Sequence, residues 1–335
     1  MSNKEEYNRI LEVIDINQFS DEKAFADSCG KKFRNVRNAF YVVLIVSLFY
    51  MMWAGALFPK NDLIMMVITL SVFVTILAYM KQRKILHREL NTYLFRECYP
   101  DKGLSRYANF IPMMLKKQVL WSKVHYNLGM GLYYLGWINK ASEMLRLMEA
   151  SCTTANDMLL ALQLKQLIAL YYMDLDVVMS CADAASMLYS KASKSEWMSK
   201  VCSDLQTTAA FASCYRSRDY RKAYQILGTP CERPLDEVKR SYYLYLAAIA
   251  SSDFEYAGSC KNYVLQNAGT TWYGRALHEG FVAEAIPSNY PGFMVNVTQL
   301  QNPSKIDKSR YKYLLAGVLL TVLMFLVPQL IRMVK

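Results

Sequence analysis

The sequence predicts an all-α protein, with an α-solenoid of helical hairpins between a transmembrane hairpin and a C-terminal transmembrane helix. Three observations support this prediction. The chain has 335 residues and is 53% hydrophobic, with only 13 Gly and 9 Pro, so helix breakers are scarce. Long uncharged stretches occur near both ends. Between them, helical spacing interrupted by short turns recurs.

The N-terminal segment, residues 1–38, resembles no secretory signal peptide, because residues 1–30 carry several acidic side chains and no apolar core. Tyr7, Ile10, Leu11 and Ile14 have i, i+3, i+4, i+7 spacing, which predicts a short amphipathic helix. This helix either docks on the rest of the protein or the membrane surface, or belongs to a partly ordered tail.

Three uncharged segments are predicted to span a membrane: residues 39–58, 63–80 and 313–331. Each contains 18 to 20 residues, and at about 1.5 Å per residue a helix of this length covers most or all of a hydrocarbon core of ~30 Å. The first two are joined by a four-residue polar turn and form a hairpin. None contains an ionisable residue, so we expect them to act as anchors.

Basic residues flank these segments asymmetrically, which predicts a topology. The N-terminus and residues 81–312 are expected in the cytoplasm, with the C-terminus outside, in a bacterial cytoplasmic membrane. Anionic lipid headgroups are the expected partners of the eight basic residues around the hairpin, and no nucleic acid is expected. These residues are Lys31, Lys32, Arg34, Arg37, Lys81, Arg83, Lys84 and Arg88.

The stretch from Leu128 to Leu145 has the pattern of one helical hairpin. Leu128-Gly129 and Leu132 lie on a first helix, Gly136 offers a helix stop, and Ala141 begins the apolar face of a second helix. The small residues Gly129 and Ala141 would let the two helices approach closely. This pattern resembles the tetratricopeptide repeat, although His125 replaces the family's early Trp and Thr153 its closing Pro.

Further copies resemble the same repeat. Asp219 and Asp253 lie 34 residues apart, which is the family's period, and each precedes an Ala by four residues. A looser copy places Ile168, Ala169, Tyr172, Asp176 and Cys181 at equivalent positions, and residues 85–117 suggest a degenerate first hairpin. The resemblance predicts about five hairpins in a repeat domain of residues 81–285 that ends in a capping helix over 271–285. A linker then covers residues 286–312.

In the tetratricopeptide family, the first helices of the hairpins line a groove for a peptide or partner helix. The resemblance therefore implies a groove that suits a peptide with apolar and acidic side chains; the alternative is that its tyrosines are packing residues. The family's clamp for C-terminal carboxylates is not matched. The implied groove residues are Lys123, Tyr126, Met130, Tyr133, Tyr134, Gln163, Gln166, Tyr215, Arg216, Lys239 and Tyr242.

No catalytic, cofactor or metal site is predicted. His87, His125 and His278 lie in unrelated contexts, and the eight cysteines never form a Cys-x-x-Cys pair. No glycine-rich phosphate loop follows a strand. The cysteines are expected to be free thiols.

The predicted function is a membrane-anchored cytoplasmic scaffold or adaptor that binds a protein partner through the groove. One alternative is an accessory or regulatory subunit of a membrane protein complex for transport or secretion. Another is an enzyme whose site only the fold assembles. The sequence leaves the partner and the oligomeric state open.

Overall fold

A computed structural model describes residues 19–57, 62–114, 122–152, 154–191 and 195–278. Every regular element within these ranges is a helix, which confirms the all-α prediction. The predicted amphipathic helix at residues 7–14, the linker and the third predicted span lie outside the described residues. So do residues 279–285 of the predicted capping helix.

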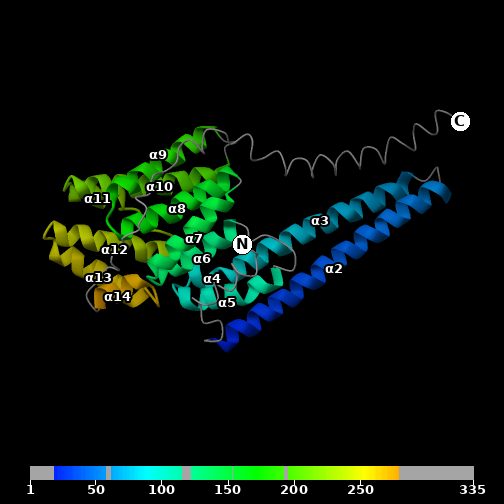
Figure 1. The fold of residues 1–335 in the computed structure, drawn as a ribbon, viewed down its shortest axis with the longest axis horizontal. Helices are drawn as coiled ribbons and strands as arrows, with labels where there is room; N and C mark the ends of the chain where they lie inside the picture. The colour runs from blue at the N-terminus through cyan, green and yellow to red at the C-terminus, as the bar shows by residue number, and fades with distance from the viewer. Residues whose placement is uncertain (1–18, 58–61, 115–121, 153, 192–194, 279–335) are drawn as a thin grey trace. The chain divides into compact units, whose positions relative to one another are not determined.

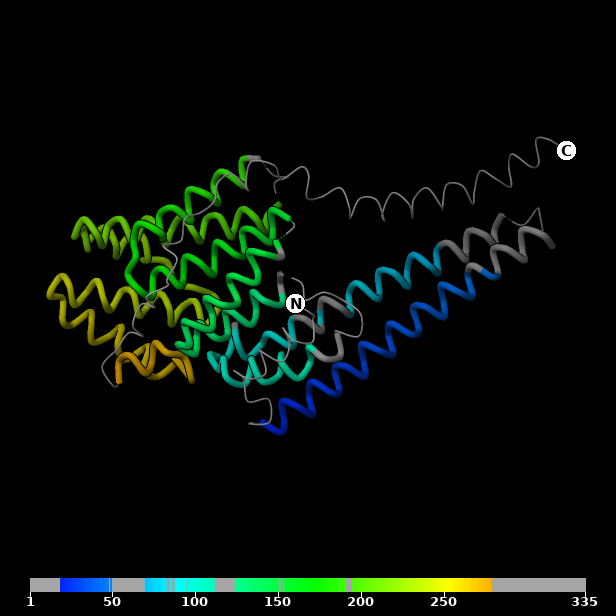
Figure 2. The backbone as a smooth tube through the Cα atoms, in the orientation of Figure 1, coloured from blue at the N-terminus to red at the C-terminus, as the bar shows by residue number. Residues whose placement is uncertain are grey.

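The described residues fall into two units, which are considered separately. The hairpin unit, Ala24–Leu90, consists of α2 (Ser20–Leu57) beyond its first turn and α3 (Asp62–Leu90). These two helices run side by side (Figures 1 and 2). Their packing includes Tyr79 of α3, whose ring centroid lies 5.2 Å from that of Phe40 and 6.2 Å from that of Phe33 on α2.

Among the residues that the structure describes, no helix combines the length and the apolar character needed to cross a membrane. The predicted localisation as an integral membrane protein is therefore wrong. The first two predicted spans are parts of α2 and α3, and these longer helices also carry the basic clusters at residues 31–37 and 81–88. The contact of these clusters with lipid headgroups stays a prediction.

The main unit comprises residues 91–278 together with the first turn of α2. Buried Glu22 in that turn accepts a 2.6 Å hydrogen bond from Arg106 Nε of α5, and the Arg106 guanidinium lies 4.3 Å from the Tyr93 ring centroid. The pair thereby attaches the beginning of α2 to the main unit. Its helices are α4 (Thr92–Phe95), α5 (Pro100–Met114), α6 (Ser122–Tyr134), α7 (Ile138–Ser151), α8 (Ala155–Tyr171), α9 (Leu175–Lys191), α10 (Glu196–Arg216), α11 (Tyr220–Ile226), α12 (Pro234–Ala250), α13 (Phe254–Asn267) and α14 (Trp272–His278).

Consecutive helices from α6 to α13 pair as four hairpins, and each hairpin packs on the next (Figure 1). We call α6, α8, α10 and α12 the first helices. Local chemistry sets several helix starts: the Thr154 and Ser195 hydroxyls each accept a hydrogen bond from a backbone N–H three residues later, and Pro234 begins α12.

The four hairpin turns share one geometry. In each, a residue with positive φ ends the first helix, and the next residue donates its N–H to a carbonyl five residues earlier at 2.9 Å, as in a Schellman motif. Three of the four next residues are Asp, and their carboxylates cap the second helix. The residues with positive φ are Gly136 (79°), Met173 (56°), Arg218 (60°) and Ser252 (61°).

These turns define the register of the repeats. The residue five positions after each positive-φ residue is almost completely buried: Ala141, Val178, Ala223 and Ala257. In the second hairpin Val178 therefore takes the place predicted for Cys181, so the predicted register of that copy is displaced by three residues. The turns are 37, 45 and 34 residues apart, and the last interval is the predicted Asp219–Asp253 period.

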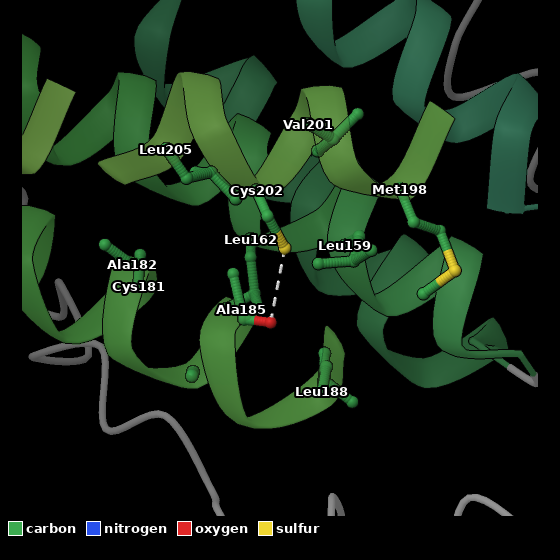
Figure 3. Packing of buried hydrophobic residues seen from close by; sticks show 11 residues of the cluster. Leu159, Leu162, Cys181, Ala182, Ala185, Leu188, Met198, Val201, Cys202 and Leu205 are labelled. Atoms are coloured by element: carbon green, nitrogen blue, oxygen red, sulfur yellow. Dashed lines mark hydrogen bonds between the residues drawn. The ribbon is translucent and has the colours of Figure 1, made fainter. Parts of the chain in front are cut away.

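Cys181 belongs instead to an apolar cluster between α8, α9 and α10 (Figure 3). Small side chains of α9 such as Ala182 and Ala185 let α10 approach closely enough for the Cys202 thiol to contact the Ala185 carbonyl at 3.4 Å. This close contact fixes the second hairpin against the third. The cluster consists of Leu159, Leu162, Cys181, Ala182, Ala184, Ala185, Leu188, Met198, Val201, Cys202 and Leu205.

Candidate functional site

The predicted groove residues all lie on first helices, but about half of them are buried. Lys123, whose side chain lies outside the described part, is on α6 with four others; two each lie on α8, α10 and α12. The residues with at most 5% of their surface exposed are Met130, Tyr133, Tyr134, Gln166 and Tyr242. This part of the first helices is therefore covered in the folded chain.

The covering element of Tyr133, Tyr134 and Tyr242 is α14, through its first two residues, whereas Gln166 is buried against α9 and α10. The Trp272 ring centroid lies 5.0 Å from that of Tyr171 on α8, 5.1 Å from that of Tyr242 on α12 and 6.2 Å from that of Tyr133 on α6. Trp272 is 4% exposed. Three first helices thus share one aromatic cluster around this indole.

Tyr273 extends the cluster. Its hydroxyl shares a 3.2 Å hydrogen bond with that of Tyr133, and its ring lies 5.0 Å from Tyr242 and 6.2 Å from Tyr134 between centroids. Burial raises the pKa of both hydroxyls in this pair well above that of an exposed tyrosine. The phenols are therefore neutral at physiological pH and act as packing and hydrogen-bonding groups.

The backbone before and after Trp272 is also fixed. Thr270 donates its N–H to the Cys98 carbonyl at 3.0 Å, and its hydroxyl lies 2.6 Å from the Asp101 carboxylate. Arg275 donates to the Leu135 carbonyl and, at 3.1 Å, to the Thr270 carbonyl. The chain's own α14 is thus firmly seated where the sequence placed the centre of the groove.

A second set of predicted residues lies in a polar cluster; Gln163 and Lys239 in this set are half-buried, whereas Tyr126 is buried. The Tyr126 hydroxyl of α6 donates to Gln163 Oε1 of α8 at 2.7 Å. Burial raises the pKa of Tyr126, and the charges of Arg233, Asp236 and Asp204 also act on it, so α10 and the start of α12 contribute to the electrostatic surroundings of this hydroxyl. The polar cluster consists of Tyr126, Gln163, Asp204, Arg233, Asp236 and Lys239.

The two carboxylates of the polar cluster, Asp204 and Asp236, lie in different electrostatic surroundings. Asp236 Oδ2 lies 2.6 Å from Arg233 Nε in an ion pair. The pKa of Asp204 is raised by burial, and the nearby Lys239 offsets only part of this effect. Burial therefore disfavours the Asp204 anion relative to that of an exposed aspartate.

Sequence reasoning found Tyr126, Gln163 and Lys239 but missed the other three members. Asp204 and Arg233 lie between the matched repeat positions, so neither had a motif to indicate it. The presence of Arg233 three residues before Asp236 at a helix start was the one available signal for an ion pair.

Tyr215 and Arg216 lie at the C-terminal end of α10, with other partners. The Tyr215 ring contacts those of Phe211 and Tyr220 at centroid distances of 5.9 and 5.7 Å. Arg216 pairs with Asp176 of α9. The structure therefore does not bring these two predicted groove residues into the polar cluster.

Three of the described thiols are poorly suited to nucleophilic chemistry. Burial raises the pKa of Cys98 to about 11 and those of Cys152 and Cys181 to about 12, so the thiolate is scarce at neutral pH. In the described ranges, no three His, Cys, Asp or Glu side chains are grouped so that they could hold a metal ion.

In comparisons with known proteins, no family model, no curated protein and no solved structure matches the chain. The resemblance to tetratricopeptide repeats stays a prediction, and the structure defines the class as all-α with stacked helical hairpins.

Proposed function

We propose that the main unit is a helical-repeat scaffold that binds a segment of a partner protein across the polar cluster. The observation that supports this is the hydrogen bond from Tyr126 of α6 to Gln163 of α8, together with the charges of Asp204 on α10 and of Arg233 and Asp236 at the start of α12, which act on the same hydroxyl. A segment that crosses several repeats needs hydrogen-bond donors and acceptors from each, because its backbone amides lose water on binding.

The charges of the cluster indicate the chemistry of the partner. One basic residue of the predicted groove, Arg216, is already paired, with Asp176, and Lys239 lowers the cost of the Asp204 charge. The Asp204 carboxylate is only partly compensated, so a Lys or Arg of the partner beside it would gain a charge-assisted hydrogen bond. The proposed partner segment therefore carries a basic residue among polar and apolar ones.

A scaffold role also agrees with the state of the thiols, since Cys98, Cys152 and Cys181 hold their protons at neutral pH. The stacking of hairpins provides a surface that extends over several helices, as extended binding proteins require.

The test is affinity capture with the full chain as bait, followed by mass spectrometry and direct titration of the recovered protein. The double variant Asp204→Asn, Lys239→Gln removes both charges and leaves the net charge unchanged. The matched control is Lys140→Gln, Glu143→Gln, which neutralises an ion pair of 4.0 Å on α7 and also preserves the net charge.

We expect a partner that is captured by the parent and the control, and that binds the cluster variant about tenfold or more weakly, equivalent to about 1.4 kcal/mol. Loss of an interface charge pair commonly costs this much. If every captured protein binds the cluster variant and the control equally, the proposed site is wrong.

A further inference from the structure

The hairpin unit has a large apolar surface that its own packing does not use. On α2, five apolar side chains are between 51% and 66% exposed; on α3, five are between 49% and 57% exposed. Within each helix these residues are spaced so that they lie on one face of the helix. These two apolar stripes are Tyr41, Val42, Ile45, Val46 and Phe49 on α2, and Leu70, Phe73, Val74, Leu77 and Met80 on α3.

The exposed apolar surface of the two stripes indicates that another apolar surface covers them. Ten large side chains that are each about half exposed present more apolar area than the few hundred Å² common on monomeric proteins. The contacts that join α2 to α3 include other side chains, such as Phe40 and Tyr79, so the hairpin itself does not cover the stripes.

The chain contains a segment with matching chemistry beyond the described residues. Residues 313–331, YLLAGVLLTVLMFLVPQLI, include no Asp, Glu, Lys or Arg. As a helix, 19 residues would extend about 28 Å at 1.5 Å per residue. Each stripe covers roughly 12–15 Å of its helix by the same rise, so the segment is long enough to cover both.

The connection to this segment permits the contact. Residues 279–312 separate it from α14 and could extend on the order of 100 Å, which exceeds the length of α2, about 57 Å by its rise. A tethered segment also has an effective concentration of about millimolar, so it competes well against the same surface on a second copy.

We propose that residues 313–331 pack along the apolar stripes of α2 and α3 within the same chain, as a third element of the hairpin unit. The interaction removes apolar surface from water on both sides and leaves no charged group unpaired, since neither the stripes nor the segment contain one. This inference is independent of the function proposed for the main unit.

The test uses a photo-reactive phenylalanine analogue in the full chain. It replaces Phe73, which is 57% exposed in the α3 stripe, so an aromatic ring substitutes for an aromatic ring. The control replaces Gln82, an exposed polar residue of the same helix. After irradiation, products are separated by mass and their peptides identified by mass spectrometry.

The Phe73 variant should give products of monomer mass that join α3 to a peptide from 313–331, at least about fivefold more than the Gln82 control, because the contact is intramolecular. A further variant with Leu323→Glu in the segment should lose these products, since burying a carboxylate on the stripe is unfavourable, while its far-UV circular dichroism stays unchanged.

Products of dimer mass would identify a second copy as the occupant and overturn the proposal. It would equally be overturned by products that contain only solvent or another molecule, or by equal yields from the Phe73 and Gln82 variants.

Discussion

The glycine at the crossing of three helices allows a quantitative test of the packing. A Cβ atom added to Gly129 of α6 would lie 2.5 Å from Leu164 Cδ2 of α8 and 3.3 Å from Met144 Cβ of α7. Leu164 is fully buried, so its methyl group has little room to turn away. Overpacking of this kind costs about 1–3 kcal/mol, and the higher helix propensity of Ala returns about 1 kcal/mol. The difference is a net destabilisation of up to about 2 kcal/mol, which we expect for Gly129→Ala in the main unit.

The chain offers a matched control. Gly258 also lies within a helix, α13, and an added Cβ there would meet no atom within 4 Å. Gly258→Ala should therefore stabilise the protein by about 0.5–1 kcal/mol through helix propensity alone. The same chemical change is thus predicted to have opposite signs at the two positions.

The assay is urea denaturation of the full chain and both variants, followed by far-UV circular dichroism. The Gly129→Ala midpoint should fall below that of the parent and the Gly258→Ala midpoint should rise above it, with similar slopes. If both variants are stabilised to the same extent, α6, α7 and α8 do not meet closely at Gly129, and the reasoning on hairpin stacking fails.

Three further predictions concern α14, a buried amide and the thiols. In the same denaturation assay, Trp272→Ala should lower the free energy of unfolding by about 3–5 kcal/mol. The control is Trp197→Ala, which changes a 43% exposed indole and should cost about 0.5 kcal/mol. Equal losses in the two variants would exclude α14 as a stabilising element. Gln166→Leu should lower the free energy of unfolding by about 1–3 kcal/mol, because the Gln166 amide donates to carbonyls of α9 and α10 at 3.0 and 2.9 Å. An unchanged free energy of unfolding would contradict these hydrogen bonds. Iodoacetamide at neutral pH should alkylate exposed Cys231 well before buried Cys181, because burial raises the pKa of Cys181 to about 12. Mass spectrometry of the peptides would measure the two alkylation rates. Comparable rates would mean that Cys181 is accessible.

Local signals predicted much of the main unit. Gly136 was expected to end a helix, and it has φ of 79°; Ala141 was expected at a close contact, and it is fully buried. Asp219 and Asp253 were expected to begin second helices, and both cap them through their carboxylates. Such features depend on a few neighbouring residues, so a sequence pattern can reveal them.

Where local signals were absent or ambiguous, the predictions failed. Met173 takes the positive-φ position of the second hairpin although it is not a glycine, so that copy was aligned three residues out of register. The localisation was inferred from the hydropathy of short segments, and the described helices that contain these segments did not meet the length and apolar character required.

The sequence by itself determined the helical class, the turns of the first, third and fourth hairpins and the capping residues Asp219 and Asp253, because composition and i to i+4 spacing act over one or two helical turns. Only the tertiary structure decided which residues of the first helices are accessible. Trp272 and Tyr273 cover tyrosines that lie up to about 140 positions earlier in the chain. This contact depends on how four hairpins stack, and no local pattern encodes it. The same stacking lets the charge of Lys239 on α12 act on Asp204 of α10.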